Sequence, residues 1–78
     1  MEDGDLIEIT FRGKEKVLAY YTGKINEVFF GEPERVGFVF LSDGELRGYN
    51  VDFVNGKSQK DYHTKSLLRT TFKVYKPL

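Results

Sequence analysis

Turn-forming residues interrupt this chain about every ten positions, a spacing that is typical of β-sandwiches and small barrels. Glycine, beside Pro, Asn, Asp or charged residues, marks the breaks at 13–16, 31–34, 42–44 and 55–56. The segments between these breaks leave little room for a helix of ordinary length, which is about 11–12 residues. A chain of 78 residues also has room for only one hydrophobic core. We therefore expect residues 1–78 to form a single all-β domain.

Alternating apolar and polar residues mark the first strands between the turns. Ile7, Ile9 and Phe11 alternate with polar residues, so one face of this strand is expected to be buried. Residues 36–41 form an almost unbroken apolar run, which we interpret as the central strand. A short Asp-Gly turn follows this run, and residues 46–54 are predicted to return beside it as the next strand.

Two further segments complete the predicted sheet. Residues 17–30 carry β-favouring side chains, with a bend expected at Gly23, where the missing side chain permits tight curvature. The last strand is expected over residues 69–76, with Phe72 and Val74 on one face.

The basic segment 57–66 lacks strand character and is predicted to form an irregular loop ending in one helical turn near 64–68. Closing so short a sheet on itself creates a core and removes most exposed edges. The sequence therefore predicts a small barrel of five to six antiparallel strands, with one short helical turn before the last strand.

Few residues in this chain have the chemistry of a catalytic or metal site. Without Cys, the chain has no disulfide, no thiolate nucleophile and no Cys-type zinc site, and a reducing compartment such as the cytoplasm is the default expectation. The one histidine, His63, lies among lysines that repel a cation. The carboxylates lack the EF-hand spacing, and there is no glycine-rich phosphate loop. We expect no catalytic residue, no metal and no cofactor, and therefore no enzyme.

The charges are balanced overall but divided along the chain. Residues 1–56 hold six basic and eleven acidic residues, a net charge of −5, whereas residues 57–78 hold six basic residues and one acidic residue, a net charge of +5. Such a division can steer an acidic partner to one face of the protein, unless folding brings the two halves together and cancels much of the field.

Aromatic side chains are the candidate contacts to a protein partner. An exposed ring beside a second ring forms a patch that is suited to protein or peptide recognition. The candidate partner-binding residues are Tyr20, Tyr21, Phe29 and Tyr49.

Basic residues interleaved with aromatic ones in the last third of the chain indicate an alternative, because nucleic-acid binders combine cationic tracks with stacking surfaces. The candidate nucleic-acid-binding residues are Lys60, Lys65, Arg69, Lys73 and Tyr75. On the last strand Arg69, Lys73 and Tyr75 are expected to share the outward face. The competing interpretation is an edge strand that its lysines protect from pairing with other chains.

Three segments resemble the Tudor, Agenet and KOW-type barrels of the SH3-like superfamily in their order and spacing. They are Gly-Asp-Leu-Ile-Glu-Ile at 4–9, Tyr-Tyr-Thr-Gly-Lys-Ile at 20–25 and Phe-Val-Phe-Leu-Ser-Asp-Gly-Glu at 38–45. The resemblance implies a small SH3-like barrel with an aromatic cage for methylated Lys or Arg near the loops. The side chains closest to the aromatic positions of these families are Tyr20, Tyr21, Phe40 and Tyr49.

A second set of segments is similar in order to the small basic archaeal chromatin proteins. These segments are 11–16, 24–29, Arg47-Gly48, Lys60-Asp61 and the Leu67-Leu68 pair. That resemblance implies a DNA-binding sheet with contacts at the positions of Phe29 and Arg47. The charge of the central segment opposes this role, since residues 28–54 hold two basic and five acidic residues, whereas binding to phosphates needs Lys and Arg.

We therefore expect a non-catalytic, cytoplasmic binding module that recognises a protein or peptide through surface aromatics. The alternative is a nucleic-acid-binding barrel that uses the basic C-terminal residues. No membrane partner is expected, because no apolar run approaches the roughly 18 residues that a membrane-spanning helix needs.

Overall fold

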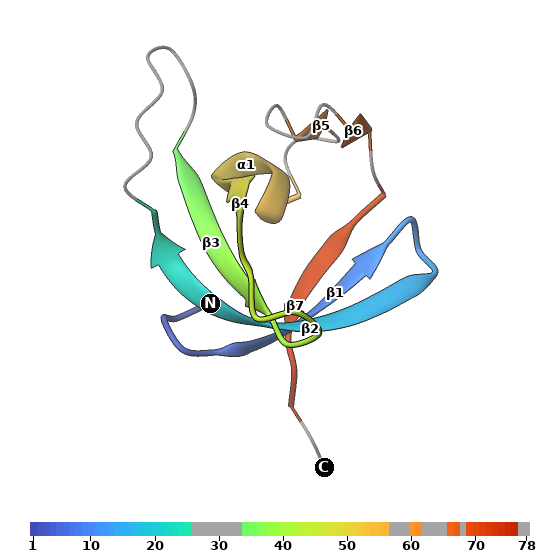
Figure 1. The fold of residues 1–78 in the computed structure, drawn as a ribbon. Helices are drawn as coiled ribbons and strands as arrows, with labels where there is room; N and C mark the ends of the chain where they lie inside the picture. Colours follow the sequence, from blue (N-terminus) through green and yellow to red (C-terminus); the bar gives the residue numbers. More distant parts are fainter. Residues whose placement is uncertain (26–33, 57–59, 62–65, 68, 77–78) are drawn as a thin grey trace.

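Five antiparallel strands form the main sheet in the computed structural model, which describes residues 1–25, 34–56, 60–61, 66–67 and 69–76 (Figure 1). In chain order the elements are β1 (Leu6–Phe11), β2 (Glu15–Lys24), β3 (Arg35–Phe40), β4 (Leu46–Asn50), α1 (Val51–Val54), β5 (Lys60–Asp61), β6 (Ser66–Leu67) and β7 (Thr71–Val74). The strand order β4-β3-β2-β1-β7 makes β4 and β7 the edges of an open sheet, and β5 pairs separately with β6. The predicted all-β fold class is confirmed.

The two faces of the sheet follow the predicted alternation of side chains. Ile7 and Ile9 on β1 are fully buried. Their partners on the neighbouring strand β7 are Val74 and Phe72, which are partly buried. Lys73, which lies between those two residues on β7, is exposed. Residues that alternate in this way put one face of the sheet in the core and the other in solvent.

Glycine produces the predicted bend in β2. The register between β2 and β3 shifts between Tyr21 and Gly23, and Gly23 has a φ of 77°, in the left-handed region that glycine adopts without a steric penalty. The strand ends at Lys24, one residue beyond the bend. The predicted continuation of this strand through 26–30 lies outside the described residues.

The prediction of a strand over 46–54 is wrong in its second half. The strand β4 ends at Asn50, whose side-chain oxygen accepts hydrogen bonds from the backbone N–H groups of Asp52 at 2.7 Å and Phe53 at 3.4 Å. Asn in this position caps the first turn of a helix, so the chain turns into α1. The helix lies over the concave side of the sheet (Figure 1), and its Phe53 is 1% exposed.

The helix that the structure describes, Val51–Val54, lies where the sequence predicted a strand, and it is not the helical turn that was predicted near 64–68. Within the predicted segment, Ser66–Leu67 form the strand β6. Residues 64, 65 and 68 lie outside the described residues.

Aromatic rings from five elements meet in the core. Phe38 on β3 is fully buried, and its ring centroid lies 5.4 Å from that of Tyr21, 5.9 Å from that of Tyr49 and 5.2 Å from that of Phe72. Phe72 on β7 also lies 5.7 Å from the ring of Phe53 in α1. Offset and edge-on ring pairs at these distances stabilise a fold by about 0.5–1.5 kcal/mol each beyond the burial of their area. The cluster holds the sheet in its curled shape.

The turn of the hairpin between β1 and β2 contains an arginine with positive φ. The N–H of Lys14 donates to the carbonyl of Phe11 at 2.9 Å, and the two residues between them, Arg12 and Gly13, have φ values of 53° and 69°. Positive φ at both central positions defines a type I′ turn, which favours Asn-Gly or Gly-Gly. Arg12 occupies the position where Asn is favoured, and among the described residues it is the only non-glycine residue with positive φ.

Replacing Arg12 by Asn should therefore stabilise the fold. We expect Arg12→Asn to raise the free energy of unfolding by about 1 kcal/mol, because Asn tolerates the left-handed region better than Arg. Such a gain raises the melting temperature of a domain of this size by about 4–8 °C, which thermal unfolding followed by circular dichroism measures. The matched control is Arg12→Gln, which removes the same charge but still disfavours positive φ. Equal melting temperatures for the two variants would contradict the assignment of a positive φ to position 12 in this turn.

Candidate binding surface on the outer face of the sheet

The four aromatic residues predicted to contact a partner do not share one surface. Tyr20 is 48% exposed on the outer face of β2, whereas the ring of the adjacent Tyr21 points into the core against Phe38. Tyr49 is 5% exposed, so its assignment as a surface residue is wrong. The register explains this burial, because Tyr49 pairs with the inward-facing Val36. Phe29 lies outside the described residues.

The side chains closest to the expected aromatic cage are divided in the same way. Phe40 is 2% exposed and, like Tyr49, belongs to the core. Of the four rings, Tyr20 alone stands on the outer surface, so these residues do not line a common opening.

The register between strands places apolar side chains in a row across the outer face. Val39 on β3 pairs with Leu46 on β4 and with Tyr20 on β2, and Tyr20 pairs in turn with Leu6 on β1. The N–H of Tyr75 donates to the carbonyl of Leu6 at 2.8 Å, which extends the row beyond β7. Directly paired residues face the same side of a sheet. The row therefore crosses β4, β3, β2 and β1 and reaches Tyr75, the residue that follows β7.

A shorter second row lies beside the first. The N–H of Leu41 donates to the carbonyl of Leu18 at 3.1 Å, and these two residues lie two positions along from Val39 and Tyr20 on the same strands. We refer to the two rows together as the outer-face patch. Its residues are Leu6, Leu18, Tyr20, Val39, Leu41, Leu46 and Tyr75.

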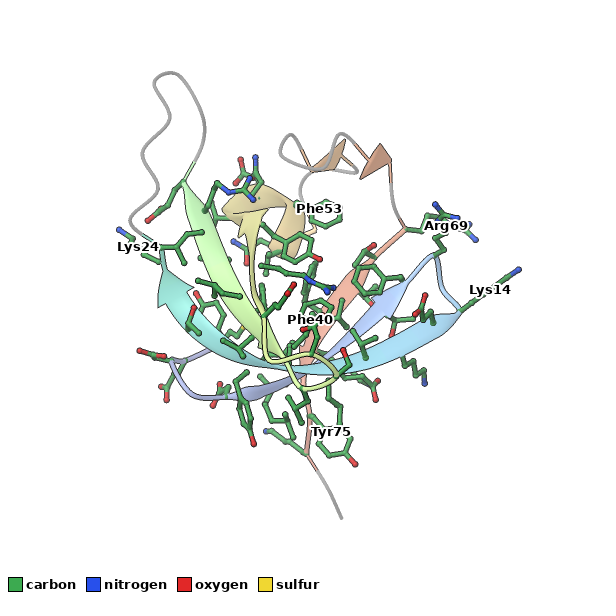
Figure 2. The ribbon with its side chains drawn as sticks, in the orientation of Figure 1. Lys14, Lys24, Phe40, Phe53, Arg69 and Tyr75 are labelled. Carbon is green, nitrogen blue, oxygen red and sulfur yellow. The ribbon has the colours of Figure 1, made fainter. Side chains whose placement is uncertain are left out.

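Exposed apolar area is concentrated in this patch. Leu46 is 55% exposed, Leu41 49% and Tyr75 37%, and together with Tyr20 they are four of the five large hydrophobic residues that are exposed in the described part of the chain. Figure 2 shows Tyr75 on the convex side of the sheet, opposite Phe40 and Phe53. Single exposed apolar residues are ordinary on a protein surface, but a contiguous group marks a candidate interaction site.

Beside Leu46, the side chain of Ile25 packs closely against two glycines, Gly37 on β3 and Gly48 on β4. A Cβ placed on Gly37 would lie 2.7 Å from Cγ2 of Ile25 and 2.8 Å from Cδ1 of Leu46, and one on Gly48 would lie 2.6 Å from Cδ1 of Ile25. The side chain of Ile25 thus covers β3 and β4 at the two glycines.

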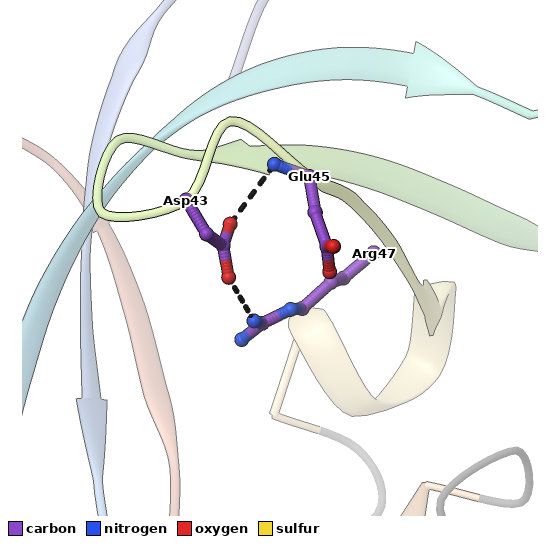
Figure 3. A network of polar contacts seen from close by, with 3 residues as sticks. All are labelled: Asp43, Glu45 and Arg47. Carbon is purple, nitrogen blue, oxygen red and sulfur yellow. Dashed lines mark hydrogen bonds and ion pairs between the residues drawn. The ribbon is translucent and has the colours of Figure 1, made fainter.

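A polar network holds the turn between β3 and β4 (Figure 3). One carboxylate oxygen of Asp43 accepts from the N–H of Glu45 at 2.9 Å, and the other accepts from the guanidinium of Arg47 at 2.5 Å. The guanidinium carbon of Arg47 also lies 4.2 Å from the ring centroid of Phe40, a cation–π contact. The network fixes the turn that joins Leu41 to Leu46, two residues of the outer-face patch.

Of the four predicted basic residues, the structure describes the side chains of Arg69 and Lys73. Lys73 is exposed on the outward face of the edge strand β7 as expected, but its ammonium lies 3.7 Å from the carboxylate of Glu8, its direct partner on β1. Arg69 is exposed before β7, whereas Lys60 contributes its backbone to β5. Lys65 lies outside the described residues. The pairing with Glu8 and the place of Lys73 on an edge fit the interpretation of a lysine-protected edge strand.

One surface ion pair joins the ends of β2 and β3. The ammonium of Lys24 lies 2.7 Å from the carboxylate of Glu34. The hydrogen bond to Glu34 and then its negative charge raise the pKa of Lys24 above its ordinary value. A raised pKa means that this pair favours the folded state at neutral pH and that its contribution is lost when Lys24 deprotonates in alkali. Both side chains are largely exposed, so solvent screens the interaction.

Comparison with protein-family models, with curated proteins and with solved structures finds no match. The resemblance to SH3-like families thus stays a prediction. Among the residues that the structure describes, no three His, Cys, Asp or Glu side chains are placed to hold a metal ion together. No helix in the described part of the chain is long and apolar enough to cross a membrane.

Two residues of the patch beside the turn, Leu41 and Leu46, were missed from the sequence. Apolar residues flanking an Asp-Gly turn look like the ends of buried strands, and only the pairing of Leu46 with Val39 shows that they face outward. The period-two pattern from the buried Phe40 and Phe38 was the available signal, since it assigns Val39 and Leu41 to the opposite face.

The turn network predicts a graded loss of stability. We expect Asp43→Ala to lower the free energy of unfolding by about 1 kcal/mol, because it removes both hydrogen bonds of a partly exposed carboxylate. Asp43→Asn should lose only part of this stability, since its amide oxygen still accepts from Glu45. Urea unfolding of the two variants and the wild type measures the difference. If both variants unfold at the wild-type urea concentration, the network has no role in stability.

Proposed function

We propose that this chain is a non-catalytic binding module that recognises a protein partner through the outer-face patch. The observation that carries the proposal is the gathering of four exposed large apolar residues on one face of the sheet. Exposing such a group to water costs free energy that is recovered when a partner covers it, at about 25 cal/mol for each Å² of apolar area.

The composition of the patch favours a protein partner over nucleic acid. Five of its seven side chains are aliphatic, and aliphatic groups offer no flat face on which a base can stack. The patch itself contains no cation for a phosphate. An apolar centre with Tyr anchors and a polar rim is instead the usual composition of a protein interface. Glu8 and Lys73 provide part of such a rim beside Leu6 and Leu18.

Tyr20 is the expected anchor of the interface. Its strand is the middle one of the sheet, and Leu6 and Val39 flank it on the two neighbouring strands. Interface residues near the centre, Tyr in particular, contribute most of the binding free energy, whereas those at the rim contribute little. Of the aromatic contacts predicted from the sequence, the proposed interface thus keeps Tyr20. It adds the aliphatic residues that surround Tyr20.

Nucleic-acid binding through the basic C-terminal residues has less support. Lys73 is paired with Glu8, which lowers the positive charge available at the centre of the proposed track. Tyr75, the aromatic member of that group, belongs to the outer-face patch.

Substitutions of Tyr20 test the proposed function. The tagged wild-type chain is used to capture proteins from a lysate of its own source cells, and a captured protein is then purified and titrated directly. We expect Tyr20→Ser to weaken its binding at least about tenfold, which corresponds to about 1.4 kcal/mol. Tyr20→Phe, the matched control that keeps the ring, should bind within about threefold of the wild type, a difference of well under 1.4 kcal/mol. Amide shifts on binding should centre on Tyr20 and Val39.

Three results would overturn the proposal. In the first, the Tyr20→Ser variant retains every protein that the wild type retains, with the same affinity. In the second, the wild type sediments as a dimer and Tyr20→Ser as a monomer, which would make the patch a contact between copies of this chain. In the third, only single-stranded DNA or RNA shifts the amide of Tyr20. The melting temperature of each variant should stay close to that of the wild type, because surface substitutions usually change stability by about 0.5 kcal/mol or less.

A further inference from the structure

Four cations gather at the hairpin end of the sheet. Arg12 and Lys14 belong to the turn between β1 and β2, and Lys16 follows at the start of β2. The N–H of Gly13 donates to the carbonyl of Arg69 at 3.1 Å, which brings Arg69 to the same turn. Figure 2 shows Lys14 and Arg69 at the same end of the molecule. We refer to Arg12, Lys14, Lys16 and Arg69 as the basic end.

The pairing of β1 with β7 brings two of these cations close together. Thr10 pairs with Thr71, the last pair of the ladder, and Arg12 and Arg69 each lie two residues beyond it. The N–H of Gly13 donates to the carbonyl of Arg69, so the register shifts by one residue beyond that pair while the two segments stay side by side. Like charges that are held close together in this way repel each other.

The basic end lacks the compensation that other cations of this protein have. Lys24, Arg47 and Lys73 each lie within ion-pairing distance of a carboxylate. In the described ranges, no such ion pair is formed by any cation of the basic end. Glu15 is the one acidic residue within the segment 12–16. The fold thus tolerates a local excess of positive charge that it does not neutralise with its own described residues.

The backbone conformation of Arg12 also supports a functional role for this residue. An Arg with a φ of 53° occupies a turn position that Asn or Gly fills at a lower conformational cost. Departures from local preference that bring no gain in stability are typical of functional positions. Here both the strain at position 12 and the repulsion from Arg69 are retained for a guanidinium group.

A hollow adjoins these side chains. This open surface hollow of about 510 Å³ is lined by Phe11, Arg12, Lys14 and Glu15. Phe11 is half-buried, with its ring 6.3 Å from that of Phe40, so it forms a fixed apolar wall. Arg12 and Lys14 provide guanidinium and ammonium donors for an oxyanion, and an Arg can hold a carboxylate with two parallel hydrogen bonds.

We propose that the basic end binds an acidic segment of a protein. A compact cluster of cations suits a few adjacent carboxylates. A nucleic-acid backbone requires a longer track of cations for its regularly spaced phosphates. Such a track is interrupted here, because Lys73, the next cation along the outward face of β7, is already paired with Glu8.

The basic end also adjoins the outer-face patch. Lys16 pairs with Thr10 and lies two residues from Leu18 on the same face of β2. A protein with an acidic segment beside an apolar surface can therefore contact both. In this respect the inference deepens the proposed function and rests on it for the class of partner, but the anion site itself depends on the four cations alone.

A labelled polyglutamate peptide tests this site. It is titrated into the full chain at about 0.01 M and about 0.1 M salt, where the Debye length falls from about 30 Å to about 10 Å. We expect binding at the lower salt concentration, with weaker binding at the higher one. Arg12→Asn and Arg69→Gln should each weaken the binding at least about fivefold. Lys24→Gln is the matched control, since it removes a cation at the opposite end of β2 (Figure 2) and should change the affinity by less than about twofold.

The Arg12→Asn variant distinguishes a loss of binding affinity from a loss of folded protein. Its expected gain in stability means that a weaker affinity cannot be ascribed to unfolding. Polyglutamate binding that is unchanged in Arg12→Asn and Arg69→Gln would overturn the proposal. So would tighter binding of oligothymidylate than of polyglutamate, with the same loss in both variants, because the site would then belong to nucleic acid.

Failure of the proposed function gives a different result. Tyr20→Ser should bind polyglutamate like the wild type, because Tyr20 does not belong to the basic end. If the outer-face patch has no partner, binding of polyglutamate at the basic end is unaffected. If only the proposal for the basic end is wrong, Tyr20→Ser still weakens the binding of the captured protein, whereas Arg12→Asn leaves that binding unchanged.

Discussion

The ring of Phe72 joins the two edges of the sheet, and the curled shape of the protein depends on it. The backbone of β7 pairs only with β1, yet the ring of Phe72 lies 5.2 Å from that of Phe38 on β3 and 5.6 Å from that of Tyr49 on β4. A flat five-stranded sheet, with neighbouring strands about 4.8 Å apart, would keep β7 more than about 14 Å from β3. The ring contacts therefore require a curled sheet with the aromatic residues inside.

The curl determines which side chains remain for a partner. The concave side is filled by the aromatic cluster and by Phe53 of α1, so the convex side carries the residues that the core does not use. On that side the register aligns Leu46, Val39 and Tyr20 across neighbouring strands. The hairpin that joins β1 to β2 then adds the basic end beside the apolar residues. An apolar surface and a cluster of cations thus come from one folding pattern, and both support the binding role that we propose.

Local patterns predicted much of this arrangement. The alternation of Ile7 and Ile9, the bend at Gly23 and the inward face of Phe72 all depend on residues close in sequence, and all were predicted. The helix α1 was missed, because it depends on the side chain of Asn50 accepting backbone hydrogen bonds rather than facing solvent in a strand.

The candidate surface was harder to predict because it depends on pairing between distant segments. Tyr20 and Leu46 belong to one row only because both pair with Val39, and sequence alone does not specify that register. The burial of Tyr49 has the same origin, since it follows from pairing with Val36. The approach of Arg69 to the turn that contains Arg12 also requires β7 to lie beside β1.

A double-mutant cycle between Phe72 and Tyr49 tests most directly whether the aromatic cluster joins the edges of the sheet. The free energy of unfolding is measured for the wild type, Phe72→Leu, Tyr49→Leu and the double variant. Ring contact at 5.6 Å predicts a coupling free energy of about 0.5–1.5 kcal/mol between the two positions. If the two single losses add to the double loss within about 0.3 kcal/mol, the rings do not interact, and packing between β7 and β4 is contradicted.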